Sequence, residues 1–296
     1  MIPLLSERDQ QEYVTDGMVP IQYLLRFIKE DSPFGDVTSD AVIPDTTCRA
    51  VIRAEQEGII AGIGEASALF VHFGIVAEPG KQDGDTIIPH DIVLSLSGNA
   101  KGILLVERTA LNIIGRMSGI ATQTRKMVEI VHAVNPACRI ASTRKTCPGF
   151  RALDKKAVQL GGGDPHRMSL SDGILIKDNH LVLVPLAEAI RSAKAVSAYR
   201  KIEVEVETPQ DALTAALEGA DIILLDNMAP RKVQKTLADL KRACLRDRVT
   251  IELSGGIDEA TLPEYAALDV DIISMGALTH TVKNFSVTLE VLPGTG

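Results

Sequence analysis

Residues 202–226 read IEVEVETPQDALTAALEGADIILLD, and this stretch points to the fold class. Its first and last five residues are short aliphatic runs typical of buried strands. The segment between them begins at Pro209 and has helical apolar spacing. A strand, a helix and a second strand in so short a span indicate two parallel strands joined by a helical crossover. The stretch therefore predicts an α/β protein.

The same alternation extends on both sides of this stretch. Strands are expected at 139–141, 173–177, 202–206, 221–226, 249–253 and 271–275, and helices at 186–197, 209–218, 231–245 and 258–268. Such alternation implies a parallel sheet, either open or closed into a barrel. Residues 1–110 have mixed character, with a helix expected at 21–28 and strands at 49–54 and 86–96. A long helical pattern follows over 104–134, broken by Gly115 and Gly119.

Composition narrows the class of protein. The chain has 296 residues, 45% hydrophobic and 24% charged, with a net charge of −8, as expected for one large or two moderate globular domains. An acidic chain argues against a nucleic-acid partner. The four cysteines form no CxxC pair, which favours reduced thiols in a cytoplasmic protein.

Targeting and membrane signals are weak. Met1–Gln10 carries acids and no apolar core, so no signal peptide is expected. Residues 58–76 are the longest weakly charged stretch and could span a membrane on length alone. Because they include Glu65, His72 and four glycines, a strand, a glycine-rich turn and a buried helix are favoured, and no membrane partner is expected.

Short runs of polar or small residues follow the expected strands. The runs that follow them are Thr143–Thr146, Lys177–His180, Glu207–Thr208, Asp226–Asn227, Ser254–Gly256 and Gly276–Ala277. In a barrel these ends converge on one mouth, and in an open sheet they line a crevice. The small residues of the last two runs expose backbone N–H groups, which suits phosphate binding.

A local reversal of charge marks a binding site for anions. Residues 139–167 contain seven basic and two acidic side chains, which gives +5 inside an acidic chain. Arg144 and Lys145 follow a strand in the expected mouth. His166 and Arg167 follow three glycines, and a guanidinium suits carboxylate. These residues predict a receptor for a multiply anionic substrate.

Acidic residues alternate along one expected strand. Glu203, Glu205 and Glu207 share one face, which in a barrel points inward. Glu205 together with Asp226 could hold Mg²⁺ or bind ribose hydroxyls. An internal salt-bridge lattice with the neighbouring lysines stays open, above all for Glu203.

The chain resembles the quinolinate phosphoribosyltransferase family (nicotinate-nucleotide pyrophosphorylase, carboxylating). The resemblance covers nearly the whole chain, in ten motifs that keep their order and spacing. The motifs are Gly35-Asp-Val-Thr38, Glu107-Arg-Thr-Ala-Leu-Asn112, Ser118-Gly-Ile-Ala121, Thr143-Arg-Lys-Thr146 with Pro148-Gly149, Gly161-Gly-Gly163 with His166-Arg167, Leu175-Ile-Lys-Asp-Asn-His180, Glu203-Val-Glu205, Leu224-Leu-Asp-Asn227, Ser254-Gly-Gly256 and Gly276-Ala-Leu-Thr-His280.

The resemblance implies a fold and an assembly. The fold is an N-terminal α/β sandwich domain (1–111, joined by the C-terminal tail 280–296) followed by an incomplete α/β barrel (112–279). The assembly is a homodimer with shared active sites, or a higher homo-oligomer built from it. In that dimer Arg108 reaches the partner subunit's substrate.

The resemblance also implies an activity, namely Mg²⁺-dependent phosphoribosyl transfer from phosphoribosyl pyrophosphate (PRPP) to quinolinate with decarboxylation, in NAD biosynthesis. It assigns Arg108, Arg144, His166, Arg167 and Lys177 to quinolinate. It assigns Lys145, Glu205 and Asp226 to catalysis, with the two acids also on the metal. Lys145 and Lys177 would contact PRPP, and the phosphate cradle would be Ser254, Gly255, Gly256, Gly276 and Ala277.

Three alternatives stay open at this point. A paralogue, such as the type associated with molybdate transport, would share the fold and use another acceptor. A binding protein would keep the scaffold without catalysis. An aldolase-like barrel would use Lys145 or Lys177 as a Schiff base, since a fold alone is a weak guide to function.

Overall fold

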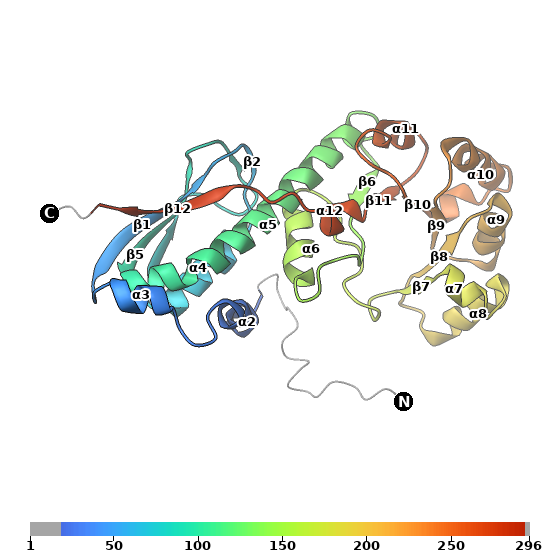
Figure 1. Ribbon diagram of the computed structural model, residues 1–296. Helices are drawn as coiled ribbons and strands as arrows, with labels where there is room; N and C mark the ends of the chain where they lie inside the picture. The colour runs from blue at the N-terminus through green and yellow to red at the C-terminus, as the bar shows by residue number, and fades with distance from the viewer. Residues whose placement is uncertain (1–18, 294–296) are drawn as a thin grey trace. The chain divides into compact units, whose positions relative to one another are not determined.

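The computed structural model describes residues 19–293, so the absence of a signal peptide expected from Met1–Gln10 lies outside the described residues (Figure 1). The chain forms two compact units. One holds the described residues up to Gln123, residues 152–161 and the tail from Val282. The other holds residues 124–151 and 162–281. No helix within 19–293 is both long and apolar enough to cross a membrane.

The first unit is built on an antiparallel sheet of order β12-β1-β5-β3. Its strands are β1 (Thr47–Ala54), β3 (Val76–Pro79), β5 (Ile92–Asn99) and β12 (Val287–Leu292). Helix α4 (Ile63–His72) packs on β3 and β5, and α2 (Ile21–Asp31) packs on α4. Helix α3 (Val37–Val42) is capped by the Asp36 side chain. The expected α/β sandwich is confirmed.

Residues 86–96 form two strands, so the expectation of one is wrong. Strand β4 (Thr86–Ile87) pairs with β2 (Gly58–Ile59), whereas β5 starts at Ile92 and joins the larger sheet. Between them His90 has a positive φ of 74°, and the amide of Ile88 donates to the Asp91 carboxylate at 3.2 Å. This tight turn separates two segments that the alternation of side chains alone cannot separate.

Helix α5 (Ala100–His132) is continuous, so the expected break at Gly115 and Gly119 is wrong. The two glycines face the C-terminal tail instead. A Cβ on Gly119 would lie 2.2 Å from the carbonyl oxygen of Lys283, and one on Gly115 would lie 3.0 Å from that of Phe285. The amide of Phe285 donates to the Gly115 carbonyl at 2.8 Å. The glycines therefore let an extended segment lie directly on the helix.

The second unit is a parallel sheet of order β6-β11-β10-β9-β8-β7 (Figure 1). Its strands are β6 (Arg139–Ala141), β7 (Ile174–Ile176), β8 (Ile202–Val206), β9 (Ile222–Asp226), β10 (Thr250–Ser254) and β11 (Ile272–Ser274), all where the sequence predicts them. Among the described strands, β6 and β7 are the two edges and do not pair with each other. The sheet is therefore an incomplete barrel, as expected.

Helices cover the outside of this sheet. They are α8 (Leu186–Val196), α9 (Pro209–Glu218), α10 (Pro230–Arg242) and α11 (Leu262–Ala266). The short helices α7 (Asp178–Leu181), η1 (Arg246–Arg248) and α12 (Ala277–His280) lie in the connections that precede or follow strands. Helix α11 is shorter than the predicted 258–268. Val204 and Val206 are buried in the core between sheet and helices, as their alternation predicts. The intervening residues of β8 therefore point to the other face of the sheet.

Candidate active site

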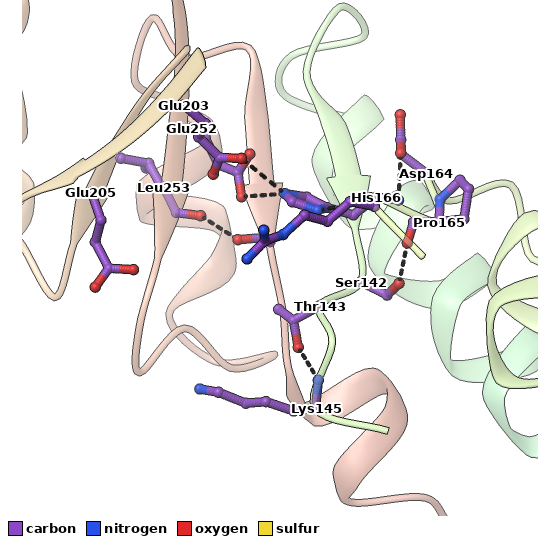
Figure 2. A network of polar contacts seen from close by, with 12 residues as sticks. Ser142, Thr143, Lys145, Asp164, Pro165, His166, Glu203, Glu205, Glu252 and Leu253 are labelled. Carbon is purple, nitrogen blue, oxygen red and sulfur yellow. Dashed lines mark hydrogen bonds and ion pairs between the residues drawn. The ribbon is translucent and has the colours of Figure 1, made fainter. Parts of the chain in front are cut away.

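The basic loop after β6 is fastened to the turn after β11. Thr143 Oγ1 accepts from the amide of Lys145 at 3.1 Å (Figure 2). Thr279 Oγ1 donates to the Lys145 carbonyl at 2.8 Å. A Cβ on Gly276 would lie 3.1 Å from Lys145 Cδ. Lys145 and Gly276, predicted from separate motifs, therefore lie side by side.

Arg144 and Arg167 are close enough to repel each other. The pKa of Arg167 is lowered, first by burial and then by the charge of Arg144. The Nε of Arg144 is buried without a hydrogen-bond partner within residues 19–293. Two neighbouring guanidinium groups suit a ligand that carries more than one carboxylate.

His166 has an unusual backbone conformation that fixes its ring. Its φ is 56°, in the left-handed region, where a residue other than glycine is uncommon. Its amide donates to Asp164 Oδ1 at 2.7 Å, and its Nδ1 accepts from the Arg167 amide at 2.8 Å. Its Nε2 lies 3.4 Å from Glu252 Oε1 and 3.7 Å from Glu203 Oε2 (Figure 2). Both ring nitrogens of His166 thus face protein groups.

Glu203 and Glu252 form a buried acidic pair. Glu252 is 1% exposed and Glu203 6%. Burial, followed by the charge of Glu252, raises the pKa of Glu203 to about 7. The lattice left open for Glu203 is therefore built from His166 and a second glutamate.

Glu252 is a residue that sequence reasoning missed. It stands between Ile251 and Leu253, which belong to the core between sheet and helices, so it must point to the opposite face. An acid flanked by two core residues in a buried strand was the available signal.

A cavity of about 610 Å³ adjoins this pair at the amino ends of the strands. His166, Glu203 and Glu252 line it, as do the first residues of five strands, namely Arg139, Ile174, Ile222, Thr250 and Ile272. The cavity therefore lies toward the amino ends of the strands, and Arg167 also lines it, whereas the predicted mouth is at the carboxyl ends.

Lys177 and Glu205 are brought together as an ion pair. Glu205 is largely buried, with 12% of its side chain exposed. Glu207 follows the end of β8 and is exposed, so the inward set on this strand has two glutamates rather than three. Asp226 ends the next strand, and its Oδ2 accepts from Asn227 Nδ2 at 2.6 Å.

The turn after β10 packs against the turn after β9. Gly255 has a φ of 93°, and a Cβ there would lie 2.3 Å from Asn227 Oδ1. The Asn227 amide donates to the Ser254 carbonyl at 2.9 Å. Only glycine fits at this close approach. Because Gly255 has no side chain, the backbone of Ser254–Gly256 is not covered at that position.

Arg108 lies on α5 in the first unit, and its side chain is exposed. All the other predicted site residues lie in the second unit. These residues offer paired guanidiniums, a lysine–carboxylate pair and glycine turns at the carboxyl ends of parallel strands. This arrangement defines a class of protein, a barrel enzyme whose substrate carries several negative charges.

Comparison with known proteins gives the family. Residues 36–118 match the model of the quinolinate phosphoribosyl transferase N-terminal domain, and residues 120–290 match that of its C-terminal domain. The chain belongs to the quinolinate phosphoribosyltransferase family.

Individual relatives agree over most of the chain. A probable nicotinate-nucleotide pyrophosphorylase [carboxylating] from Archaeoglobus fulgidus is 46% identical over 88% of this chain and 99% of its own. The human nicotinate-nucleotide pyrophosphorylase [carboxylating] is 35% identical over 82% of each chain. The solved structure of the Francisella tularensis nicotinate-nucleotide pyrophosphorylase superposes with a TM-score of 0.85, at 32% identity, over 94% of this chain and 98% of that one.

Proposed function

We propose that this chain transfers the phosphoribosyl group of PRPP to quinolinate with decarboxylation. The products are nicotinate mononucleotide, pyrophosphate and CO₂, which makes the chain a pentosyltransferase of NAD biosynthesis. The observation that carries the proposal is the juxtaposed pair Arg144 and Arg167, in a chain of this family. Quinolinate has two adjacent carboxylates, and two adjacent guanidiniums match that charge pattern.

Binding overcomes the repulsion between two anionic substrates. Arg144 and Arg167 hold the carboxylates of quinolinate, and His166 lines the same region. Lys145, beside Gly276, faces the phosphorylated sugar. The backbone amides of Ser254–Gly256 and of Gly276–Ala277 hold its 5′-phosphate. The receptor thereby orients the ring nitrogen toward the anomeric carbon of the ribose.

Bond making and breaking then follow from charge. The ring nitrogen forms a bond to the anomeric carbon as the bond to pyrophosphate breaks, through an oxocarbenium-like transition state. Glu205, oriented by Lys177, supplies negative charge near that cation, with Asp226 on the neighbouring strand. The pyridinium that results withdraws electrons, so the carboxylate next to the nitrogen leaves as CO₂. The electron pair stays on the ring carbon and takes up a proton.

Glu205 and Asp226 fit a magnesium ion by their chemistry, because both offer carboxylate oxygens from adjacent strands. Bound Mg²⁺ would supply charge neutralisation for the departing pyrophosphate. Lys177 would hold the Glu205 carboxylate in place by its ion pair.

The proposed assembly is a homodimer, or a higher homo-oligomer built from it, in which Arg108 completes the partner's site. The support is family membership together with the exposed position of Arg108 on α5. Co-expressing Arg108→Ala and Arg144→Ala subunits tests this, because each mixed dimer then contains one intact site. We expect recovery of activity in the mixture, while each variant alone stays far less active than wild type. No recovery would contradict a shared site.

The proposed location of the reaction is the cytoplasm.

The decisive experiment for the proposed activity incubates the protein with PRPP, Mg²⁺ and either quinolinate or nicotinate. We expect nicotinate mononucleotide and an equal amount of CO₂ from quinolinate only. Use of nicotinate alone would assign a different acceptor and overturn the proposal.

A further inference from the structure

The environment of His166 determines which ring nitrogen carries the proton. A backbone amide can only donate, so Nδ1, which receives the Arg167 N–H at 2.8 Å, must be an unprotonated acceptor. The proton of a neutral ring then sits on Nε2. Nε2 points at the two buried glutamates, 3.4 Å from Glu252 and 3.7 Å from Glu203. The ring therefore links a buried acidic pair to the backbone of Arg167.

This tautomer argues against a metal ion at the same place. The ligand atoms of His166, Glu203 and Glu252 lie within 4.8 Å of one another, a spacing that could suit a metal ion. A metal at Nε2 would need the lone pair of that nitrogen and would move the proton to Nδ1. Nδ1 would then meet the Arg167 N–H donor to donor. The amide contact thus favours a hydrogen-bonding role for the acids.

The glutamates are placed to accept a hydrogen bond from the Nε2–H group of His166. Across the described chain, both carboxylate oxygens of Glu252 and Oε1 of Glu203 are buried without a well-aligned hydrogen bond. Buried acceptors without donors are unfavourable, so these oxygens attract the nearest N–H, and Nε2 is within reach. The left-handed backbone of His166, supported by Asp164 Oδ1 at 2.7 Å, holds the ring in this position.

We infer that Glu252, together with Glu203, is a positioning residue for the quinolinate receptor. The acidic pair holds His166 as the Nε2–H tautomer, His166 accepts from the amide of Arg167, and the guanidinium of Arg167 is thereby oriented toward the substrate carboxylate. Glu252 itself does not contact substrate. This inference rests on the proposed function, because Arg167 is assigned to quinolinate there.

Steady-state kinetics of Glu252→Leu, Glu252→Gln and Thr250→Val test the inference. Thr250 is the matched control, since it lies on the same strand and lines the same cavity. Glu252→Leu removes the acceptor, and we expect the KM for quinolinate to rise about 10-fold or more with the KM for PRPP unchanged. Glu252→Gln retains a carbonyl acceptor of the same size, and we expect it to stay close to wild type, as should Thr250→Val.

A double-mutant cycle separates positioning from a general structural effect. If Glu252 acts through Arg167, Glu252→Leu should change the KM for quinolinate by no more than about 2-fold in an Arg167→Lys background. Additive losses, equal rises in both KM values, or a Glu252→Gln variant as impaired as Glu252→Leu would each overturn the inference.

Nitrogen NMR of the wild-type protein gives a test that needs no Glu252 variant to fold. In ¹⁵N-histidine-labelled protein, the His166 signals, assigned by their loss in His166→Asn, should show the Nε2–H tautomer at neutral pH. An Nδ1–H ring would refute the inference. Wild-type protein that makes no nicotinate mononucleotide would refute the proposed function instead, and the tautomer would still be measurable.

Discussion

Arg116 donates from Nε and Nη2 to the two carboxylate oxygens of Asp154, at 2.8 and 2.9 Å, and joins α5 to α6 (Arg151–Leu160). Asp154 is fully buried and Arg116 is 21% exposed. Lys156, two residues further along α6, contacts Glu65 at 2.8 Å and Asp83 at 2.9 Å. These ion pairs fasten α6 to the first unit although it follows a strand of the second.

Arg116→Met should lower the free energy of unfolding by about 3–5 kcal/mol, because it leaves a buried carboxylate without its bidentate partner. Urea denaturation measures the change. Arg53→Met is the matched control, because Arg53 pairs with Glu290 at 3.3 Å on the surface, and about 1 kcal/mol or less is expected there. Equal losses in the two variants would contradict the importance of burial.

Arg144→Ala should lose about 2–4 kcal/mol of transition-state stabilisation for quinolinate, which is about 30- to 1000-fold in kcat/KM. The reason is that one of the two guanidiniums of the proposed quinolinate receptor is removed. Arg191→Ala, on the outer helix α8 and paired with Glu218, is the control and should behave as wild type. A near-normal kcat/KM for quinolinate in Arg144→Ala would remove this residue from the receptor.

Gly119→Ala should destabilise the protein by about 1–3 kcal/mol, because the new methyl group would meet the Lys283 carbonyl oxygen and force the tail away from α5. Gly102→Ala, in the same helix, is the control. Its nearest neighbour is the flexible Ile75 side chain at 3.3 Å, and the gain in helix propensity offsets that crowding. Thermal unfolding compares the two, and a stable Gly119→Ala would disprove the close approach.

The stability contributed by Glu203 should fall as the pH rises. Its folded pKa of about 7 lies above the ordinary glutamate value of 4.5, so between these values the folded state binds more protons than the unfolded state. Stability therefore falls from about pH 4.5 to about pH 7, by up to ~3 kcal/mol, and is flat above. Glu203→Gln should lose this dependence, so urea midpoints of variant and wild type should diverge over that range. Parallel midpoints would contradict the raised pKa.

Removing magnesium should abolish turnover, because the pyrophosphate leaving group would keep its full negative charge. Product formation in EDTA should fall to background and return when Mg²⁺ is added in excess. Turnover unaffected by EDTA would eliminate the metal from the proposed reaction.

The sequence predicted local features of the fold well. The six parallel strands are short aliphatic runs bounded by polar turns, and this signal needs no distant partner. The basic loop at Arg144 and Lys145 was visible for the same reason, as a charge reversal after a strand.

Features that depend on distant residues could not be predicted. The hydrogen bond from Thr279 to Lys145 joins positions 134 residues apart. From sequence alone Gly119 is expected to break the helix, because its close contact with the Lys283 carbonyl is visible only in the structure. The role of Glu252 depends on its contact with His166. The backbone of His166 is in the left-handed region, which sequence patterns do not reveal.

The sheet of the first unit includes β12, formed by residues 287–292 and paired with β1 along its length. During synthesis the ribosome therefore completes the whole barrel before it releases the strand that finishes the N-terminal domain. Until then one edge of β1 is open, with its backbone N–H and C=O groups unpaired. While the residues between β1 and β12 are being translated, that edge must be protected from pairing with other chains, either by a chaperone or because translation is faster than aggregation.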